Sequence, residues 1–303
     1  MSNVILAKKT IAAINDAMER DQGAIYRMWL GRVLPHMTDA YRVDEDGFRS
    51  HLGGSLLGRS CARELWYGFH WVKKAKFPAS VLRLFNRGHL EEGRFIAMLL
   101  MIGCSVEQQD AQGKQLRISD CNGHLGGSLD GVVMGVPDAP HGLQLLTEFK
   151  THNDKSFQKL EKEGVRNAKF EHYIQMNVYM YKRGLTAALY LAVNKNNDKL
   201  YGEIVLLNAE IAEEFIQRGS NIIYSDAAPP KLNNSPGWFE CSYCDYKMVC
   251  HNGGAPETNC RTCAYSYPDN SGDWTCKQGG VPFALNKEQQ QNGCTHWEKH
   301  SSL

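Results

Sequence analysis

The sequence predicts an α/β protein with a mixed central sheet flanked by helices, a helical N-terminal region and a Cys-rich C-terminal tail. Apolar segments of strand length, bounded by turn residues, predict strands at 104–108, 123–136, 143–150, 187–194 and 200–206. Apolar residues at helical spacing predict helices among them, at 82–102, 171–182 and 208–225. A chain of 303 residues, 43% of them hydrophobic, can bury a sizeable core in one large domain or two.

The N-terminal part carries no residues that suggest chemistry. Apolar positions recur at helical spacing from 5 to 41, with Gly23 as a break, which predicts a helical region over 1–54. A further helix is expected near 55–67, with Ser55 as its N-cap and Cys61 on its buried face. We expect the main domain over 55–255 and a separate tail over 256–303.

Two strand segments carry an arrangement of acids that suits a metal ion. Asp130 follows Gly127 in the first segment, and Glu148 and Lys150 lie near the end of the next one. Alternate side chains of a strand share a face, so Glu148 and Lys150 point one way and Phe149 the other. Two carboxylates suit Mg²⁺ or Mn²⁺, and a neighbouring ammonium can hold a water at a phosphate. Taken alone, such a short pattern is also typical of a turn cap beside a surface ion pair.

Two predicted helices add polar residues at regular spacing. Gln175 and Tyr179 are four residues apart and therefore share a helix face. In the helix at 82–102, Gly88 is followed four residues later by Glu92, with His89 as an alternative donor. The Lys-rich segment 152–169 predicts a loop or short helix that contacts a nucleic-acid backbone beside the site.

Together these residues resemble the PD-(D/E)xK nuclease superfamily, in the branch of the RecB- and AddB-type nuclease domains, the CRISPR adaptation exonucleases and the phage recombination exonucleases. The matching elements follow in order: Gly88 with Glu92, Gly127 with Asp130, Glu148 with Lys150, and Gln175 with Tyr179. The resemblance implies a restriction-endonuclease-like core. It implies one or two Mg²⁺ or Mn²⁺ ions, with these ligands: Glu92, Asp130, Glu148 and the backbone carbonyl of Phe149. Lys150 would orient the attacking water, and Gln175 and Tyr179 would support Lys150 or the scissile strand.

Ten cysteines without an export signal predict metal or redox chemistry, because cytosolic thiols stay reduced. Cys241, Cys244 and Cys250 are close enough in sequence to share one centre but leave it one ligand short. Spacing alone does not separate iron–sulfur from zinc. With Cys61 as the fourth ligand, the set resembles the iron–sulfur layout of the same nuclease branch. That resemblance implies a structural [4Fe–4S] cluster that closes the nuclease domain.

A second cysteine set lies in the tail, which is rich in Gly, Pro and Asn and has few apolar residues. Short segments of this kind usually need a metal or disulfide to fold. We expect a zinc-ribbon-like site, with free thiols as the alternative, formed by Cys260, Cys263, Cys276 and Cys294.

The charge distribution favours a polyanionic partner, although the formal net charge is only +1. Residues 59–94 contain eight Lys or Arg against three acids, and residues 150–183 contain eight against four. Both segments flank the predicted metal site, where phosphates would pass. A scatter of solvated charges is the alternative. No run of eighteen apolar residues occurs, so no membrane span is expected and the cytoplasm is the expected compartment.

The carboxylates and Lys150 predict metal-dependent hydrolysis of DNA. The resemblance to the nuclease branch implies an exonuclease that acts in recombination, repair or phage DNA metabolism. DNA with free ends or in single-stranded form is the expected substrate. A recombination or single-strand-binding protein and a second copy of the chain remain open as partners. The alternatives are a structure-selective endonuclease or CRISPR-adaptation trimming enzyme, and a non-catalytic nucleic-acid-binding protein stapled by metal.

Overall fold

A computed structural model describes residues 4–43 and 47–303. The chain forms two compact units that alternate along the sequence. The first unit contains Met1–Asp44, Phe77–Ile118 and Ser128–Ala212, and the second contains Glu45–Lys76, Ser119–Gly127 and Glu213–Leu303. This division differs from the linear blocks predicted from sequence, because segments distant in the sequence pack together in each unit.

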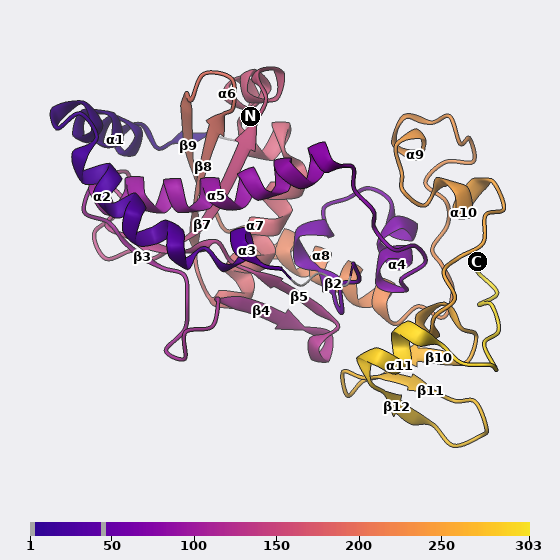
Figure 1. Cartoon of the computed structure of the whole chain (residues 1–303). Coiled ribbons are helices and arrows are strands. Elements are labelled where there is room, and N and C mark those ends of the chain that lie inside the picture. Colours follow the sequence, from indigo (N-terminus) through magenta and orange to yellow (C-terminus); the bar gives the residue numbers. More distant parts are fainter. Residues whose placement is uncertain (1–3, 44–46) are drawn as a thin grey trace. The chain divides into compact units, whose positions relative to one another are not determined.

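The first unit is built on a six-stranded mixed sheet with the order β1-β9-β8-β7-β6-β3 (Figure 1). Its strands are β1 (Ile5–Leu6), β3 (Ser105–Glu107), β6 (Gly131–Met134), β7 (Leu145–His152), β8 (Ala187–Asn194) and β9 (Leu200–Leu206). β7 and β8 run parallel, and the other neighbouring pairs are antiparallel. The mixed α/β class is therefore as predicted, and the two acid-bearing segments pair antiparallel as β6 and β7.

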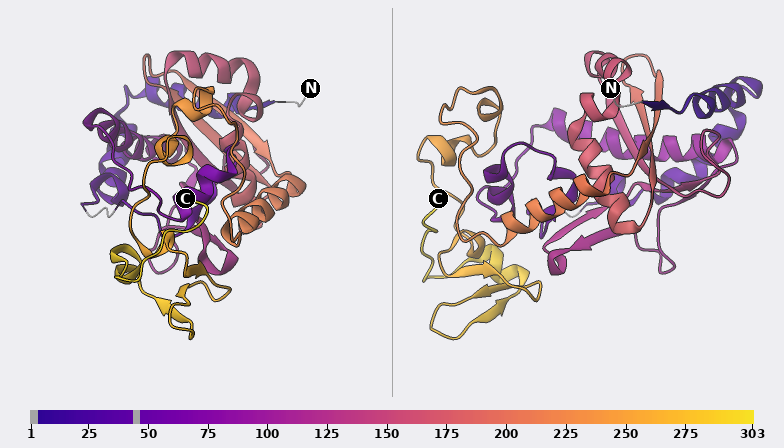
Figure 2. Two further views of the ribbon diagram at one scale, coloured as in Figure 1. Left: turned by 90° about the vertical axis from the view of Figure 1, so that its right-hand side faces the viewer. Right: turned by 180° about the vertical axis from the view of Figure 1, so that it is seen from behind.

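Helices cover both faces of this sheet. The helices α1 (Lys8–Arg20), α2 (Ala24–Val33) and α5 (Ala79–Met101) lie on one face, and the helices α6 (Asp154–Ala168) and α7 (Phe170–Arg183) lie on the other (Figure 2). A 3₁₀ turn (Leu34–His36) and α3 (Thr38–Tyr41) complete the first face. The core against α5 includes Phe149, which stacks on Phe95 with ring centroids 5.1 Å apart. No helix within the described ranges is long and apolar enough to cross a membrane.

Three local expectations are corrected. The helix expected near 55–67 with Ser55 as its N-cap begins only at Ala62, with Cys61 as its N-cap. The N-terminal region begins with β1, which adds an edge strand to β9, instead of with a helix. The segment 152–169 forms a 15-residue helix, α6, instead of a loop or short helix. Its N-cap Asn153 accepts a hydrogen bond from the Ser156 N–H at 2.9 Å, and it buries Phe157 and Leu160. Because this apolar stripe is narrow and most residues of the segment are polar, the helical periodicity was not recognised in the sequence.

Gly164 bends the end of α6 in a conformation that other residues avoid, with φ 70° and ψ 169°. The bend lets the Val165 N–H donate a hydrogen bond of 2.8 Å to the buried carboxylate of Glu203. A Cβ at position 164 would lie 2.7 Å from Val4 Cγ2.

Gly164→Ala should therefore lower the free energy of unfolding by about 1–3 kcal/mol, through backbone strain and the clash with Val4. Urea denaturation would measure this loss. Gly184→Ala is a matched control, because Gly184 also has positive φ but a Cβ there meets no atom within 4 Å. An equal loss in both variants would show that the packing at Val4 contributes nothing.

The second unit has two small sheets. One has the order β2-β5-β4, and the other is the antiparallel sheet β10-β11-β12 of the tail. The strands are β2 (Leu52–Gly53), β4 (Arg117–Asp120), β5 (Leu125–Ser128), β10 (Ser266–Pro268), β11 (Trp274–Cys276) and β12 (Phe283–Leu285). The helices are α4 (Ala62–Phe69), α9 (Phe239–Ser242), α10 (Lys247–His251) and α11 (Lys287–Asn292), and α8 (Ala209–Ile223) begins in the first unit and ends in the second. Three short 3₁₀ turns complete the unit: Gly54–Leu56, Cys121–Gly123 and Cys260–Thr262.

Arg261 lies at the centre of the second unit and is 3% exposed. Its guanidinium contacts three aromatic rings, with its Cζ 3.8 Å from the ring centroid of Trp71 and somewhat farther from those of Trp274 and Phe69. Its nitrogens donate hydrogen bonds of 2.9–3.0 Å to the Gln290 side chain and to the carbonyls of Phe69 and Ser50. Rings and neutral acceptors, with no ion pair among the described residues, thus hold this charge inside the second unit.

Candidate active site

Glu148 and Lys150 lie on β7 and point toward the face that α7 covers. In the sheet register Glu148 is opposite Tyr190 and Lys150 is opposite Ala192. Phe149 points to the α5 face, as the strand pattern predicts. Glu148 is 1% exposed, and its Oε1 forms an ion pair with the Lys150 ammonium. A buried carboxylate and a cation thus share one face of the central strand.

Asp130 is brought to the same place by the start of β6. Its Oδ2 accepts a hydrogen bond of 2.7 Å from the backbone N–H of Phe149. Gly131 follows, and a Cβ there would lie 3.1 Å from the Glu107 carbonyl and 3.2 Å from Thr147 Oγ1. The small residue therefore permits the close approach of strands that ties Asp130 to the backbone of β7.

Glu92 on α5 belongs to the same electrostatic group. It raises the pKa values of Asp130 and Glu148, so its charge lies within their reach. Its Oε1 is 3.6 Å from His89 Nδ1, and this neighbouring carboxylate raises the pKa of His89. The sequence alternatives Glu92 and His89 are therefore neighbours in one cluster.

The carboxylates in this cluster are poorly compensated. Burial raises the pKa of Asp130 well above its usual range, and the neighbouring Glu148 and Glu92 carboxylates raise it further. Burial also raises the pKa of Glu148, against the opposing effect of Lys150. Although burial alone would lower the pKa of Lys150, the Glu148 and Asp130 carboxylates raise it, so Lys150 is a cation at neutral pH. Three carboxylates facing one ammonium leave a deficit of positive charge.

α7 supplies one hydrogen bond to this cluster. Gln175 Nε2 donates to Glu148 Oε2 at 2.9 Å, and both side chains are buried. Tyr179 lies one turn further along the helix and is 2% exposed. The described hydrogen bond thus joins Gln175 to Glu148, and Tyr179 lies buried on the same helix.

A second polar group lies beside Lys150 and was missed in the sequence. The Tyr190 hydroxyl is 2.9 Å from His152 Nε2 and 3.0 Å from His172 Nδ1. Burial, and then neighbouring lysines including Lys150, lowers the pKa of His152 to about 4 and that of His172 to about 2. Both imidazoles are therefore neutral near neutral pH. The available signal was spacing: His152 is two strand positions after Lys150, and His172 is one helical turn before Gln175.

The first cysteine set is brought together in the second unit. Burial is the main cause that raises the pKa of Cys244 to about 11, and the Cys61 and Cys250 thiols contribute to it. Cys250 is influenced in turn by Cys61 and Cys241. The Cys61 thiol also caps α4 by accepting from the Glu64 N–H at 3.4 Å. The four predicted thiols are thus electrostatic neighbours.

The thiols of the second cysteine set are also electrostatic neighbours of one another. Burial raises the pKa of Cys260 to about 11, and the thiols of Cys263, Cys276 and Cys294 add to the shift. All eight cysteines of the two sets are free thiols.

The carboxylate cluster and the two cysteine sets each offer donor atoms that suit particular metals. Carboxylate oxygens beside a charge deficit suit Mg²⁺ or Mn²⁺, and both oxygens of the buried Glu148 carboxylate are held in place, Oε1 by Lys150 and Oε2 by Gln175. Sets of four cysteines are the donors that zinc and iron–sulfur clusters prefer. In the described part of the chain, however, no group of three or more His, Cys, Asp or Glu is arranged closely enough to hold a metal ion.

No protein-family model and no curated protein matches the chain. Among solved structures, the crystal structure of SSO0001 has 16% identity and a TM-score of 0.38, covering 76% of this chain and 97% of its own. An alkaline exonuclease (LHK-Exo) from Laribacter hongkongensis has 15% identity and a TM-score of 0.40, covering 65% and 90%. Its complex with dAMP has 14% identity, a TM-score of 0.35 and the same coverage. At these TM-scores the functional inference is based on the residues of this chain.

Asp130→Asn should stabilise the metal-free protein at neutral pH. Because the pKa of Asp130 is raised on folding, the wild-type protein loses stability as pH rises above the ordinary Asp pKa of about 3.9. The variant should be more stable at pH 7, and the difference should shrink on acidification. Urea denaturation with a chelator at several pH values would measure it. Asp16→Asn, at an exposed position of α1, should change nothing, and a gain independent of pH would contradict the expectation.

Gln175→Ala should lower the free energy of unfolding by about 1.5–3 kcal/mol, because it removes a buried hydrogen bond to a carboxylate. Gln158→Ala is the matched control, since Gln158 Nε2 donates to Asp154 Oδ2 at 2.8 Å on the exposed side of α6. Thermal denaturation of both variants would compare the two bonds. Equal losses would mean that burial adds nothing to the bond at Glu148.

Proposed function

We propose that the chain is a divalent-metal-dependent deoxyribonuclease of the PD-(D/E)xK type, which hydrolyses DNA phosphodiester bonds from free ends. The main support is the group formed by Asp130, Glu148 and Lys150: a hydrogen bond from the Phe149 N–H holds the first, and an ion pair joins the other two. The order in the sequence and the geometry on β6 and β7 thus agree.

Each residue has a role in this proposal. Asp130, Glu148 and Glu92, with the Phe149 carbonyl, would hold one or two Mg²⁺ or Mn²⁺ ions. A bound ion lowers the pKa of a water and neutralises charge on the phosphate. Lys150, kept protonated by its carboxylate neighbours, would orient that water and stabilise charge that develops on the phosphate oxygens. Gln175 would fix the orientation of Glu148, and Tyr179 would support the same face.

The polar group beside the site has a supporting role. His152 and His172 share the Tyr190 hydroxyl, and Ser156 Oγ is 3.1 Å from His152 Nδ1. Neutral imidazoles add no positive charge that would compete with Lys150 or with a metal. They would therefore hold the neighbourhood of Lys150 in one arrangement without altering its charge.

The two cysteine sets would hold structural metal centres. Cys61, Cys241, Cys244 and Cys250 would bind a [4Fe–4S] cluster, and the tail cysteines Cys260, Cys263, Cys276 and Cys294 would bind Zn²⁺. The first set joins Cys61 to cysteines far along the chain, so its metal would close a long loop, whereas the second set lies within the tail. A structural role follows, because none of the eight cysteines belongs to the carboxylate cluster.

Cleavage would be tested on end-labelled linear DNA and on closed circular DNA, with Mg²⁺, Mn²⁺ or a chelator. We expect cleavage of the linear form only, dependent on the metal. Asp130→Asn and Lys150→Ala should each reduce the rate by about 100-fold or more while leaving DNA binding intact. Asp16→Asn should retain full activity. Wild-type activity in both site variants would overturn the proposal, and cleavage of the closed circle would favour an endonuclease.

The centres would be tested on protein prepared without oxygen. Iron and acid-labile sulfide should be present in the wild type and in Asp130→Asn, and lost in Cys61→Ser and Cys250→Ser. Zinc should be lost in Cys260→Ser and Cys263→Ser alone. Zinc in place of iron at the first cysteine set would contradict the assignment of a [4Fe–4S] cluster. It would not affect the nuclease assignment, which the cleavage assay tests.

A further inference from the structure

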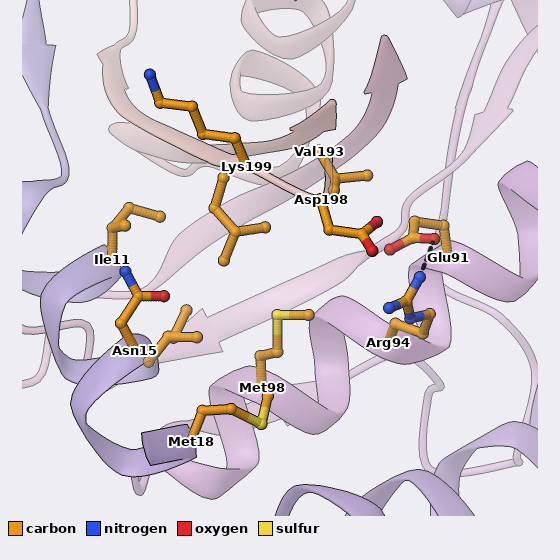
Figure 3. Close-up of a pocket in the computed structure, with 11 residues that line it drawn as sticks. Ile11, Asn15, Met18, Glu91, Arg94, Met98, Val193, Asp198 and Lys199 are labelled. Carbon is orange, nitrogen blue, oxygen red and sulfur yellow. Dashed lines mark hydrogen bonds and ion pairs between the residues drawn. The ribbon is translucent and has the colours of Figure 1, made fainter. Parts of the chain in front are cut away.

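A cavity of about 360 Å³ lies in the first unit, between α1, α5 and the turn that joins β8 to β9 (Figure 3). Most of its wall is apolar and is formed by Ile11, Ile14, Met18, Met98, Val193 and Leu200. Ligand pockets in proteins typically have volumes of about 300–1,000 Å³. The cavity is therefore large enough for a small organic molecule.

One end of the cavity is acidic. Glu91 is 4% exposed, and its Oε2 accepts a hydrogen bond of 3.0 Å from Arg94 Nη1. Its Oε1 is buried and has no hydrogen-bond partner in 4–43 and 47–303. In Figure 3 the carboxylate of Asp198, at the rim, faces that of Glu91. A buried carboxylate oxygen without a donor is costly, so this oxygen is a vacant acceptor.

The charge balance at this end is negative. Arg94 compensates one of the two carboxylates. Lys199 also lines the cavity, but it extends away from the acidic end in Figure 3 and forms an ion pair with Glu161 at 2.7 Å. Arg87 also acts on Glu91, but it does not line the cavity. One cationic group at the Glu91 end would balance the charge.

We propose that this cavity binds a small aliphatic cation, an alkylammonium or alkylguanidinium. Its head would donate to Glu91 Oε1 and Asp198, and its stem would pack on Met18, Met98 and Ile11. A metal ion fits less well: Arg94 already occupies one of the few carboxylate oxygens, and the walls away from Glu91 offer thioethers and hydrocarbon instead of oxygen ligands.

This site is separate from the carboxylate cluster of Glu92. Successive residues of a helix point about 100° apart, so Glu91 and Glu92 serve different sides of α5. Glu91, Arg94 and Met98 recur every three or four residues and line the cavity together. Binding can therefore be measured whether or not the chain cleaves DNA.

The test uses n-butylammonium and agmatine as cations and n-butanol as the uncharged control, with binding measured by calorimetry and by the shift in melting temperature. Both cations should bind at millimolar concentration and raise the melting temperature, and butanol should do neither. Glu91→Gln and Asp198→Asn should each weaken binding by about tenfold or more, because each removes a charge-assisted acceptor. Glu163→Gln, an acidic position on α6 paired with Lys159, should bind as the wild type does.

Met18→Trp keeps every charge and fills the apolar end, so it should abolish binding of butylammonium. Circular dichroism without ligand checks that each variant is folded. The last measurement uses capped lysine amide. If it binds as tightly as butylammonium, the natural ligand is a lysine side chain of a partner protein. If it binds more weakly, the natural ligand is a free amine. Equal binding by the wild type and Glu91→Gln would overturn the proposal, as would binding of Mg²⁺ with none of butylammonium.

Discussion

The first unit depends on holding like charges together. Asp130, Glu148 and Glu92 repel one another, and burial increases the cost of their charges. The opposing forces come from three directions. The Phe149 N–H binds Asp130, the Gln175 amide binds Glu148, and the Lys150 ammonium attracts both. Each of these groups is fixed by backbone structure, so the sheet order and the placement of α7 are what allow the acids to meet.

The parallel pairing of β7 and β8 is the central element of this arrangement. The chain leaves β7, forms α6 and α7, and returns along β8, which brings α7 over the Glu148 face. The other face is filled by Phe149 against Phe95 of α5. One strand therefore carries the apolar core on one side and the acidic cluster on the other, and a shift of its register by one residue would exchange them.

Sequence patterns predicted the elements with strong local signals. Alternation on β7 placed Glu148 and Phe149 on opposite faces, and helical spacing placed Gln175 on α7. Signals that depend on tertiary packing were missed. α6 buries few apolar residues among many lysines, and β1 has only two residues, paired with a strand about 200 positions later. The Tyr190 group was missed because its three side chains come from separate elements. Spacing relates each histidine to a site residue, but only the fold brings both histidines to the Tyr190 hydroxyl.

The cysteine sets illustrate the same limit in a different way. Close spacing in the sequence predicted that Cys241 and Cys244 share a metal site. Cys61 was assigned to that site only through a family resemblance. The structure brings Cys61 into their electrostatic neighbourhood at the N-cap of α4. The units that result are interleaved, so a boundary drawn at a single position in the chain cannot separate them.

Arg261 gives the tail a property that ion pairs do not. Its described partners are rings, carbonyls and an amide, all of them uncharged. Dissolved ions weaken attraction between exposed opposite charges but act little on a buried cation against aromatic faces. The folded tail should therefore tolerate concentrated salt. Lysine, with a compact ammonium in place of a planar fork, could not replace this arginine.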